Sequence, residues 1–175
     1  AIRHRLDTIR ELSLDRAYGT ESVQQFFNHV RDEEWEPVGI VADFVEVERD
    51  YEAIVEDLLH AELQYVVVQD LLHAEKSLSI VRDATRGRLD FFVLAPGRDS
   101  VYAPDAVPGA QPVADVVRLD ARLHSFASRI SGMYIVDDLE RAWELSERHA
   151  GKTFVARSGE VVRDRLISWG ERSGQ

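Results

Sequence analysis

Cysteine is absent from the 175 residues, and methionine occurs only once. Without thiols the chain can form neither a disulfide framework nor a thiolate metal site. No apolar run approaches the ~20 residues of a membrane-spanning helix, so we expect no membrane contact. The sequence also lacks a GxxxxGK(S/T) loop, a GxGxxG turn after a strand, a GxSxG elbow and an HExxH pair. We therefore expect no catalytic, cofactor-binding or metal-binding residue and no enzyme activity in this chain.

Two acidic neighbours, Asp137 and Asp138, are the feature that comes nearest to a magnesium site. They directly precede an expected helix, where Asp138 would serve as N-cap and Asp137 would gain from the helix dipole. The six histidines are scattered and contain no i,i+4 pair. We therefore interpret the two aspartates as a helix start and the histidines as surface or core residues.

The charge is strongly negative and unevenly distributed. The formal net charge of −11 argues against a surface lined with nucleic-acid contacts. Residues 141–175 nevertheless hold 7 Lys/Arg against 5 Asp/Glu, a net of +2, which leaves −13 for residues 1–140. This asymmetry has two interpretations: ordinary surface variation, or a weak, salt-sensitive DNA contact. The candidate DNA contacts are Arg157, Arg163, Arg165 and Arg172.

The hydrophobic pattern predicts a mixed α/β fold with two similar lobes. The first lobe should contain helix 20–30, strand 38–47, helix 51–59, strand 65–68, helix 71–81 and strand 89–94. A proline-rich stretch follows, of which we interpret residues 101–112 as an inter-lobe linker. The second lobe should contain strand 113–117, helix 119–130, strand 133–136, helix 139–143 and strand 152–156.

The two lobes form an internal repeat. A shift of 68 residues places Val68 on Val136, Asp70 on Asp138 and Ala74 on Ala142. In each lobe an aspartate would then cap the helix that follows an apolar strand. Pseudo-symmetric lobes suit a two-fold assembly, in which one lobe meets the other lobe of a partner chain.

Trp169 belongs to a terminal segment, Leu166–Gly170, that is typical of a strand. An aromatic side chain at this position either packs into the core or forms part of a partner interface on an edge strand. The sequence leaves both alternatives open.

Several segments, taken in order, point to a known family. Residues 39–47 (GIVADFVEV), 51–59 (YEAIVEDLL) and 63–70 (LQYVVVQD) are followed by residues 134–142 (YIVDDLERA) and 153–162 (TFVARSGEVV). This series resembles the hinge domain of SMC (structural maintenance of chromosomes) proteins of the bacterial type. The likeness covers residues 35–170, and it rests on the order and spacing of the segments rather than on one motif.

One segment departs from the family pattern. SMC hinges close with a glycine-rich strand of the form G-(L/I)-(I/V)-(T/S)-G-G, which corresponds here to residues 165–170. Gly170 matches, whereas Arg165 and Trp169 stand where the family has glycine. In the family these glycines allow two backbones to approach closely. The resemblance therefore implies a dimer interface at Ile167, Ser168, Trp169 and Gly170, with an atypical geometry.

The resemblance also implies an organisation and a function. The expected parts are the end of an incoming coiled-coil arm (1–15), lobe I (16–100), the linker (101–112), lobe II (113–170) and the root of an outgoing arm (171–175). The domain would be a non-catalytic homodimerisation module of a cytoplasmic, nucleoid-associated chromosome condensation and segregation ATPase. Its ATPase heads, and the sites for kleisin and accessory subunits, would lie outside this chain. A regulatory α/β domain that binds a small molecule between its lobes is the alternative.

Overall fold

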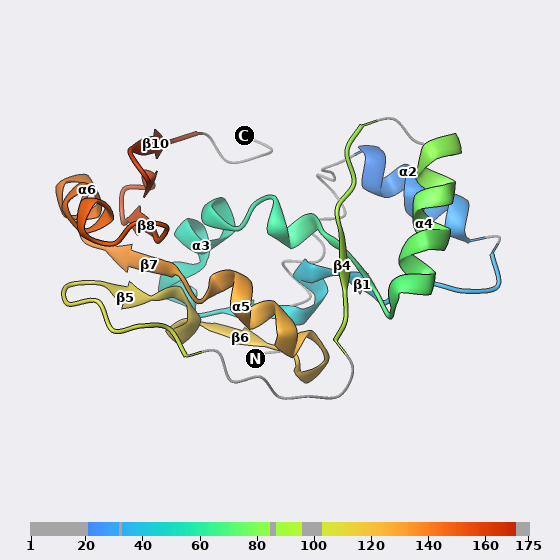
Figure 1. Cartoon of the computed structure of the whole chain (residues 1–175), viewed down its shortest axis with the longest axis horizontal. Helices are drawn as coiled ribbons and strands as arrows, with labels where there is room; N and C mark the ends of the chain where they lie inside the picture. Colours follow the sequence, from blue (N-terminus) through green and yellow to red (C-terminus); the bar gives the residue numbers. More distant parts are fainter. Residues whose placement is uncertain (1–20, 32, 85–86, 96–102, 171–175) are drawn as a thin grey trace. The chain divides into compact units, whose positions relative to one another are not determined.

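The computed structural model describes residues 21–31, 33–84, 87–95 and 103–170. They form two compact units, which are treated separately below (Figure 1). Unit 1 contains the described residues up to Val45 and from Ala61 to residue 95, and unit 2 contains residues 46–60 and 103–170. The two segments expected to belong to coiled-coil arms, 1–15 and 171–175, lie outside the described residues.

Unit 1 is a small three-stranded sheet with two longer helices. The sheet order is β1-β3-β4, with β1 antiparallel to β3 and β3 parallel to β4. Helices α2 and α4 contact one another, and α4 packs on β3 and β4 (Figure 1). One cluster of its core consists of Phe26, Val30, Val66, Val68 and Ala74. The elements are α2 (Glu21–Val30), β1 (Gly39–Ile40), the 3₁₀ helices η1 (Val41–Phe44) and η3 (Glu62–Gln64), β3 (Val66–Val68), α4 (Leu71–Ala84) and β4 (Phe91–Val93).

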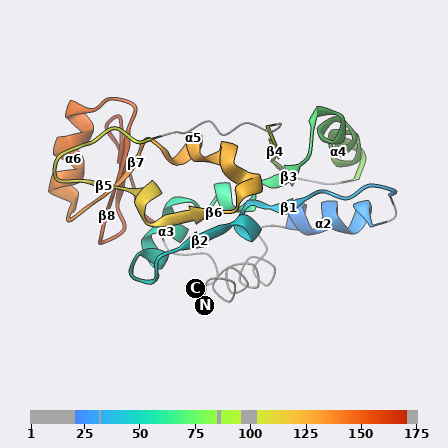
Figure 2. The ribbon, with the colours of Figure 1, turned by 90° about the horizontal axis from the view of Figure 1, so that it is seen from below.

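Unit 2 contains a five-stranded sheet of order β10-β9-β8-β7-β5. Its strands are β5 (Gln111–Pro112), β7 (Met133–Val136), β8 (Thr153–Ala156), β9 (Val161–Arg163) and β10 (Leu166–Ser168). Helix α6 (Leu139–Arg148) packs against β7, β8 and β9 (Figure 2). The core beneath it is made of Val107, Tyr134, Val136, Ala142, Leu145, Phe154, Ala156 and Val162.

A second, two-stranded sheet pairs β2 (Val45–Val47) with β6 (Val117–Leu119), and all of its residues except Val45 belong to unit 2. The helices around it are η2 (Arg49–Tyr51), α3 (Glu52–Leu58), η4 (Val113–Asp115), η5 (Ala121–Phe126) and α5 (Ala127–Ile130). The sequence placed residues 46–60 in lobe I, whereas the structure places them in unit 2. The physical reason is that β2 pairs with β6 and that the Glu48 N–H donates to the Val116 carbonyl (2.9 Å).

Part of the segment expected to be a linker is built into unit 2. Val107 is buried in its core, and the Tyr134 hydroxyl donates to the carbonyl of Asp105 (2.7 Å). Lys152 Nζ lies 2.8 Å from Asp105 Oδ2. This hydrogen bond raises the pKa of Lys152 and lowers that of Asp105. A buried tyrosine needs a partner for its hydroxyl, and the segment around residue 105 supplies it.

The internal repeat is confirmed. Each unit has an apolar strand, a helix and a second strand parallel to the first: β3-α4-β4 in unit 1 and β7-α6-β8 in unit 2. Asp70 Oδ1 accepts from the His73 N–H (2.9 Å), and Asp138 Oδ1 accepts from the Arg141 N–H (2.8 Å). Both aspartates therefore satisfy a backbone donor in the first turn of their helix, as expected.

Residues 38–47, expected to be one strand, form two short strands separated by η1. Asp43 causes the break, because its Oδ2 accepts from the Ile40 N–H (3.0 Å) and turns the backbone. Gly39, at φ +151°, has a backbone conformation that side chains rarely adopt. The same arrangement recurs in the second half of the chain, where η4 separates β5 from β6.

Candidate functional site

The candidate site is the hairpin that ends the described chain. Strands β9 and β10 pair antiparallel, with Leu166 opposite Arg163 and Ser168 opposite Val161. The two residues between them, Asp164 and Arg165, have φ of 45° and 71°. A two-residue turn with positive φ at both positions matches the right-handed twist of the two strands. The expected terminal strand is thus present, as the second strand of a tight hairpin.

The turn is fixed to the rest of unit 2 by its two side chains. Asp164 Oδ1 accepts from the Gly151 N–H (2.8 Å). The Arg165 guanidinium lies 5.2 Å from the centre of the Trp143 ring and 3.8 Å from Glu147 Oε2. These contacts hold the hairpin against α6, so the position of β10 is defined within the unit.

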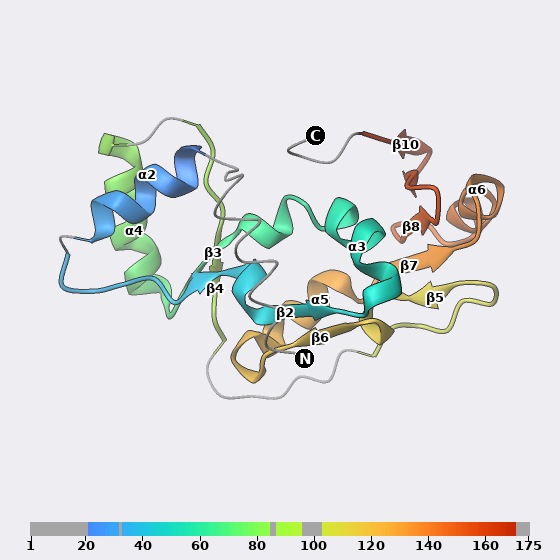
Figure 3. The ribbon, with the colours of Figure 1, turned by 180° about the vertical axis from the view of Figure 1, so that it is seen from behind.

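Strand β10 is an edge strand of its sheet (Figure 3), and it carries exposed apolar side chains. Among the residues the structure describes, its neighbour in the sheet is β9 and its other edge has no strand. Leu166 is 67% exposed, Ile167 47% and Trp169 67%. Trp169 therefore does not pack into the core, which excludes one of its two interpretations. Apolar side chains on an unprotected edge form a surface that favours association with another chain.

The last two residues of the predicted interface segment, Trp169 and Gly170, differ in their surroundings. The Trp169 ring lies over Gly159, where a Cβ would be 3.5 Å from Trp169 Nε1. At Gly170, in contrast, a Cβ would meet no atom within 4 Å. Nothing in the described part of the chain therefore requires glycine at position 170. The structure brings all four predicted interface residues, 167–170, together on one exposed segment.

The predicted DNA contacts are spread over unit 2, and each described one has an acidic neighbour. Arg157 Nε lies 3.7 Å from Asp137 Oδ1, and Arg163 Nε lies 3.6 Å from Asp164 Oδ2. Hydrogen bonding to Tyr51 raises the pKa of Arg157, and Asp137 adds to this effect. Arg165 contacts Glu147 as described above, and Arg172 lies outside the described residues.

Asp137 and Asp138, the two residues that come nearest to a magnesium site in the sequence, both have structural roles. Asp138 caps α6, and the charge of Asp137 faces Arg157. Within the described ranges, no cluster of three or more His, Cys, Asp or Glu side chains could hold a metal ion. Nor is any helix in that part of the chain long and apolar enough to cross a membrane.

Sequence reasoning missed a second exposed apolar surface, at the start of α4. The apolar spacing that predicts helix 71–81 includes Leu71 and Leu78, but they are 66% and 40% exposed, and the adjacent Leu72 is 57% exposed. Val93, on the edge strand β4, is 38% exposed. Two leucines in the first helical turn, where polar residues are typical, were the available signal.

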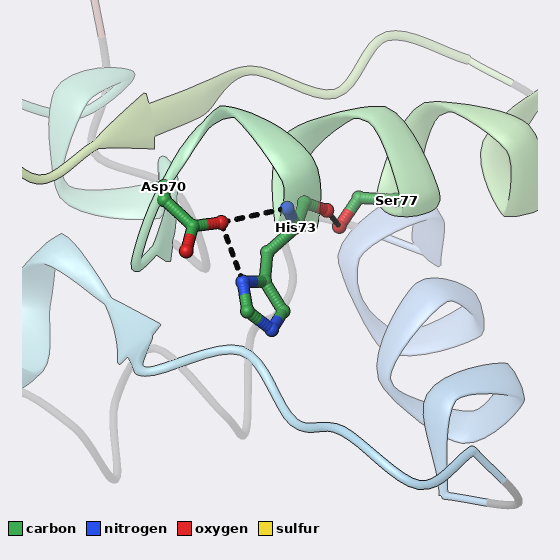
Figure 4. A network of polar contacts seen from close by, with 3 residues as sticks. All are labelled: Asp70, His73 and Ser77. Atoms are coloured by element: carbon green, nitrogen blue, oxygen red, sulfur yellow. Dashed lines mark hydrogen bonds and ion pairs between the residues drawn. The ribbon is translucent and has the colours of Figure 1, made fainter.

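A polar network fixes the start of α4 (Figure 4). His73 Nδ1 lies 2.6 Å from Asp70 Oδ1, and the Ser77 hydroxyl donates to the His73 carbonyl (2.7 Å). The His73 ring also meets the Trp35 ring edge-on, with centroids 5.4 Å apart. The hydrogen bonds from His73, backbone first and ring second, lower the pKa of Asp70. This end of α4 is therefore held as a formed helical turn.

Comparison with known proteins decides the family. The model of the SMC proteins flexible hinge domain matches residues 36–146, more than half of the chain. The chain belongs to the SMC hinge family. SMC hinges mediate dimerisation of SMC proteins. The resemblance proposed from sequence, including the mixed α/β fold, is thereby confirmed.

Individual relatives agree with this assignment. The chromosome partition protein Smc of Koribacter versatilis is 30% identical over 92% of this chain, which spans 13% of that protein. The SMC hinge of Geobacillus stearothermophilus, solved as an asymmetric dimer, has a TM-score of 0.73 at 20% identity. The match covers 99% of this chain and 74% of the chain in that structure. The Pyrococcus furiosus SMC hinge has a TM-score of 0.68 at 21% identity, and the match covers 99% of this chain and 92% of the chain in that structure. At these identities the solved structures establish the hinge fold.

Proposed function

We propose that this hinge homodimerises through the segment Ile167–Gly170 and so joins two coiled-coil arms of a chromosome condensation and segregation protein. The observation that carries the proposal is β10, whose three residues are all exposed although two of them are large and apolar. An edge strand of this kind leaves both its backbone edge and its side chains without a partner in the described chain. Association with a second copy would cover both.

The finer features of the whole protein follow from the same proposal. The parent protein would be an ATPase whose nucleotide-binding heads lie beyond this chain, as would its contacts with kleisin and accessory subunits. It would act in the cytoplasm, at the nucleoid. The similarity to a bacterial chromosome partition protein supports this view. Family membership also favours dimerisation over the small-molecule-binding alternative.

Direct contact between the hinge and DNA stays a prediction. The net charge of +2 in residues 141–175 favours it. The carboxylates near Arg157, Arg163 and Arg165 oppose it, because each must be displaced or shared before the arginine can bind a phosphate. We therefore propose dimerisation, rather than DNA contact, as the main function of the described residues.

Gly170 offers a direct test of the dimer. Gly170→Asp should be tolerated in the single chain, because a Cβ there meets open space. Across a dimer contact it would place a charge where the backbones approach, so we expect the dissociation constant to rise about tenfold or more. Sedimentation velocity over a wide concentration range measures the change.

The matched control is Gly132→Asp, which adds the same charge at another glycine with open space around it. This variant should dimerise like the unmodified chain. If the unmodified chain sediments only as a monomer, the proposed function is wrong. If Gly170→Asp dimerises as tightly as the control, residue 170 lies outside the interface.

A further inference from the structure

Strand β10 has little packing of its own to hold it in place. All three of its residues are exposed, so the strand adds no buried side chain to unit 2. A two-stranded hairpin without such packing is marginally stable in water. The forces that keep β10 paired with β9 must therefore come largely from the turn between the two strands and from the contacts that its side chains make.

The turn does not supply this stability by itself. Both of its residues have positive φ, 45° at Asp164 and 71° at Arg165. Aspartate is common in a turn of this kind, whereas the second position is typically glycine, because a residue with a Cβ is strained there. Arginine at position 165 therefore disfavours the closed hairpin unless its side chain makes contacts that compensate.

Helix α6 provides these contacts. The Arg165 guanidinium lies 5.2 Å from the centre of the Trp143 ring, and its Nη1 lies 3.8 Å from Glu147 Oε2. Trp143 and Glu147 are four residues apart, so they lie on the same face of α6. Trp143 also packs against the core of unit 2, which gives the guanidinium a fixed surface. We call Arg165, Trp143 and Glu147 the hairpin clamp.

The order of β10 in the single chain affects association. A protein that adopts its binding-competent conformation only part of the time binds more weakly, in proportion to the fraction of competent molecules. Each of two associating copies brings one β10 segment, so this fraction enters the dissociation constant twice. A clamp that keeps β10 formed before association therefore tightens a dimer without touching the second copy.

We infer that Arg165 is a positioning residue for the dimer contact, an inference that rests on the proposed dimerisation through Ile167–Gly170. Its guanidinium, held by Trp143 and Glu147, keeps β10 paired with β9 in the single chain. Arg165 thus acts within its own chain, through the order of β10, and not by contact with the second copy.

The inference can be tested from the helix side of the clamp. Glu147→Lys replaces attraction for Arg165 by repulsion and leaves the hairpin sequence intact. We expect amide hydrogen exchange in residues 164–170 to become about threefold faster, measured by mass spectrometry far below the dissociation constant, where the chains are single. The dissociation constant, measured by sedimentation velocity, should rise about tenfold, because two hairpins are affected.

Two variants of the hairpin itself complete the series. Arg165→Ala removes both contacts of the guanidinium, so exchange should be faster and the dimer weaker than in Glu147→Lys. Arg165→Lys keeps a cation that can approach both the Trp143 ring and Glu147. This variant should therefore retain most of the slow exchange and most of the affinity.

The matched control is Glu144→Lys, which makes the same charge change on the same helix. The Glu144 carboxylate pairs with Arg141 (3.8 Å) and Arg148 (3.1 Å) rather than with the hairpin. The control also reduces the repulsion between two acidic copies by the same amount as Glu147→Lys. Exchange in residues 164–170 should be unchanged in the control, and the urea midpoints of the two variants should agree.

Each other result contradicts part of the argument. A dimer weakened by Glu147→Lys without faster exchange would mean that α6 contacts the second copy directly, and the inference would be wrong. Faster exchange in a dimer as tight as the control would show that the order of β10 does not govern association. A lower urea midpoint than the control would assign Glu147 to general stability. An unmodified chain that sediments only as a monomer would overturn the proposed function, whereas the exchange experiment would still show whether the clamp orders β10.

Discussion

At Arg165, a single residue combines backbone strain with two side-chain contacts. Its φ of 71° is left-handed, which costs a residue with a Cβ about 1–2 kcal/mol. Its guanidinium lies over the Trp143 ring, and an exposed cation–π contact of this kind contributes about 0.5–1 kcal/mol. The guanidinium also lies near Glu147, and an exposed ion pair contributes at most about 1 kcal/mol. The side chain thus offsets much of the strain that its own backbone creates.

The strain can be measured by comparing two variants at this position. Arg165→Gly and Arg165→Ala both remove the contacts with Trp143 and Glu147, but only alanine keeps the left-handed strain. We expect the glycine variant to be more stable than the alanine variant by about 1 kcal/mol, measured by urea unfolding at equal protein concentration. Equal stabilities would mean that the turn relaxes when the arginine side chain is removed.

The same residue shows what the family pattern could and could not predict. The sequence places Arg165 at a family glycine position, and the resemblance implied that glycine there permits close approach of two backbones. The hairpin turn supplies a reason within one chain, because glycine adopts a positive φ without strain. The φ of residue 165 depends on the pairing of β9 with β10, which no local pattern of residue types specifies.

At the scale of elements, prediction succeeded where local signals agreed with tertiary packing. Strand β7 begins and ends as predicted, and α6 follows an aspartate N-cap that the sequence displays. Residues 119–130 were expected to form one helix, whereas η5 meets α5 after a kink at Leu123. Leu123, Phe126 and Ile130, which are spaced as on one face of a helix, are nevertheless all buried, so the apolar spacing was informative although the backbone type was not.

The candidate site was only half predictable for a related reason. The terminal strand has a recognisable pattern, but helical periodicity does not distinguish side chains that face the core from those that face a partner. Ala74 is buried and Leu71 exposed, although both belong to the same apolar spacing that predicts helix 71–81. The three-dimensional fold was needed to separate them.

The break between β1 and β2 provides a test at the element scale. At Gly39 a Cβ would lie 2.6 Å from Asp43 Oδ2, the atom that accepts from the Ile40 N–H, and φ is +151°. Gly39→Ala should therefore lower the free energy of unfolding by about 1–3 kcal/mol. Gly132→Ala is the control, since nothing lies within 4 Å of the Cβ position there. Urea unfolding of the two variants should differ, and equal midpoints would show that the 3₁₀ turn adjusts without cost.

At the scale of the whole molecule, the balance between charge and apolar contact governs association. Each chain has a net charge of −11, so two copies repel each other at a distance. Salt shortens the range of this repulsion, from about 30 Å at 0.01 M to about 10 Å at 0.1 M. The surfaces assigned to the dimer contact are apolar, and salt does not screen apolar burial.

These two facts predict opposite salt dependences for the dimer and for the predicted DNA contact. Raising the salt from about 0.01 M to about 0.3 M should tighten the dimer a few-fold, because it screens repulsion between the chains. Any binding of duplex DNA through Arg157, Arg163 and Arg165 should weaken steeply over the same range, because the entropy gained on releasing counterions from the DNA falls as the salt concentration rises. Sedimentation velocity measures the dimer, and fluorescence anisotropy of a labelled duplex measures the DNA complex. A dimer that weakens with salt would indicate that ion pairs between the chains outweigh both their repulsion and the apolar contact of β10.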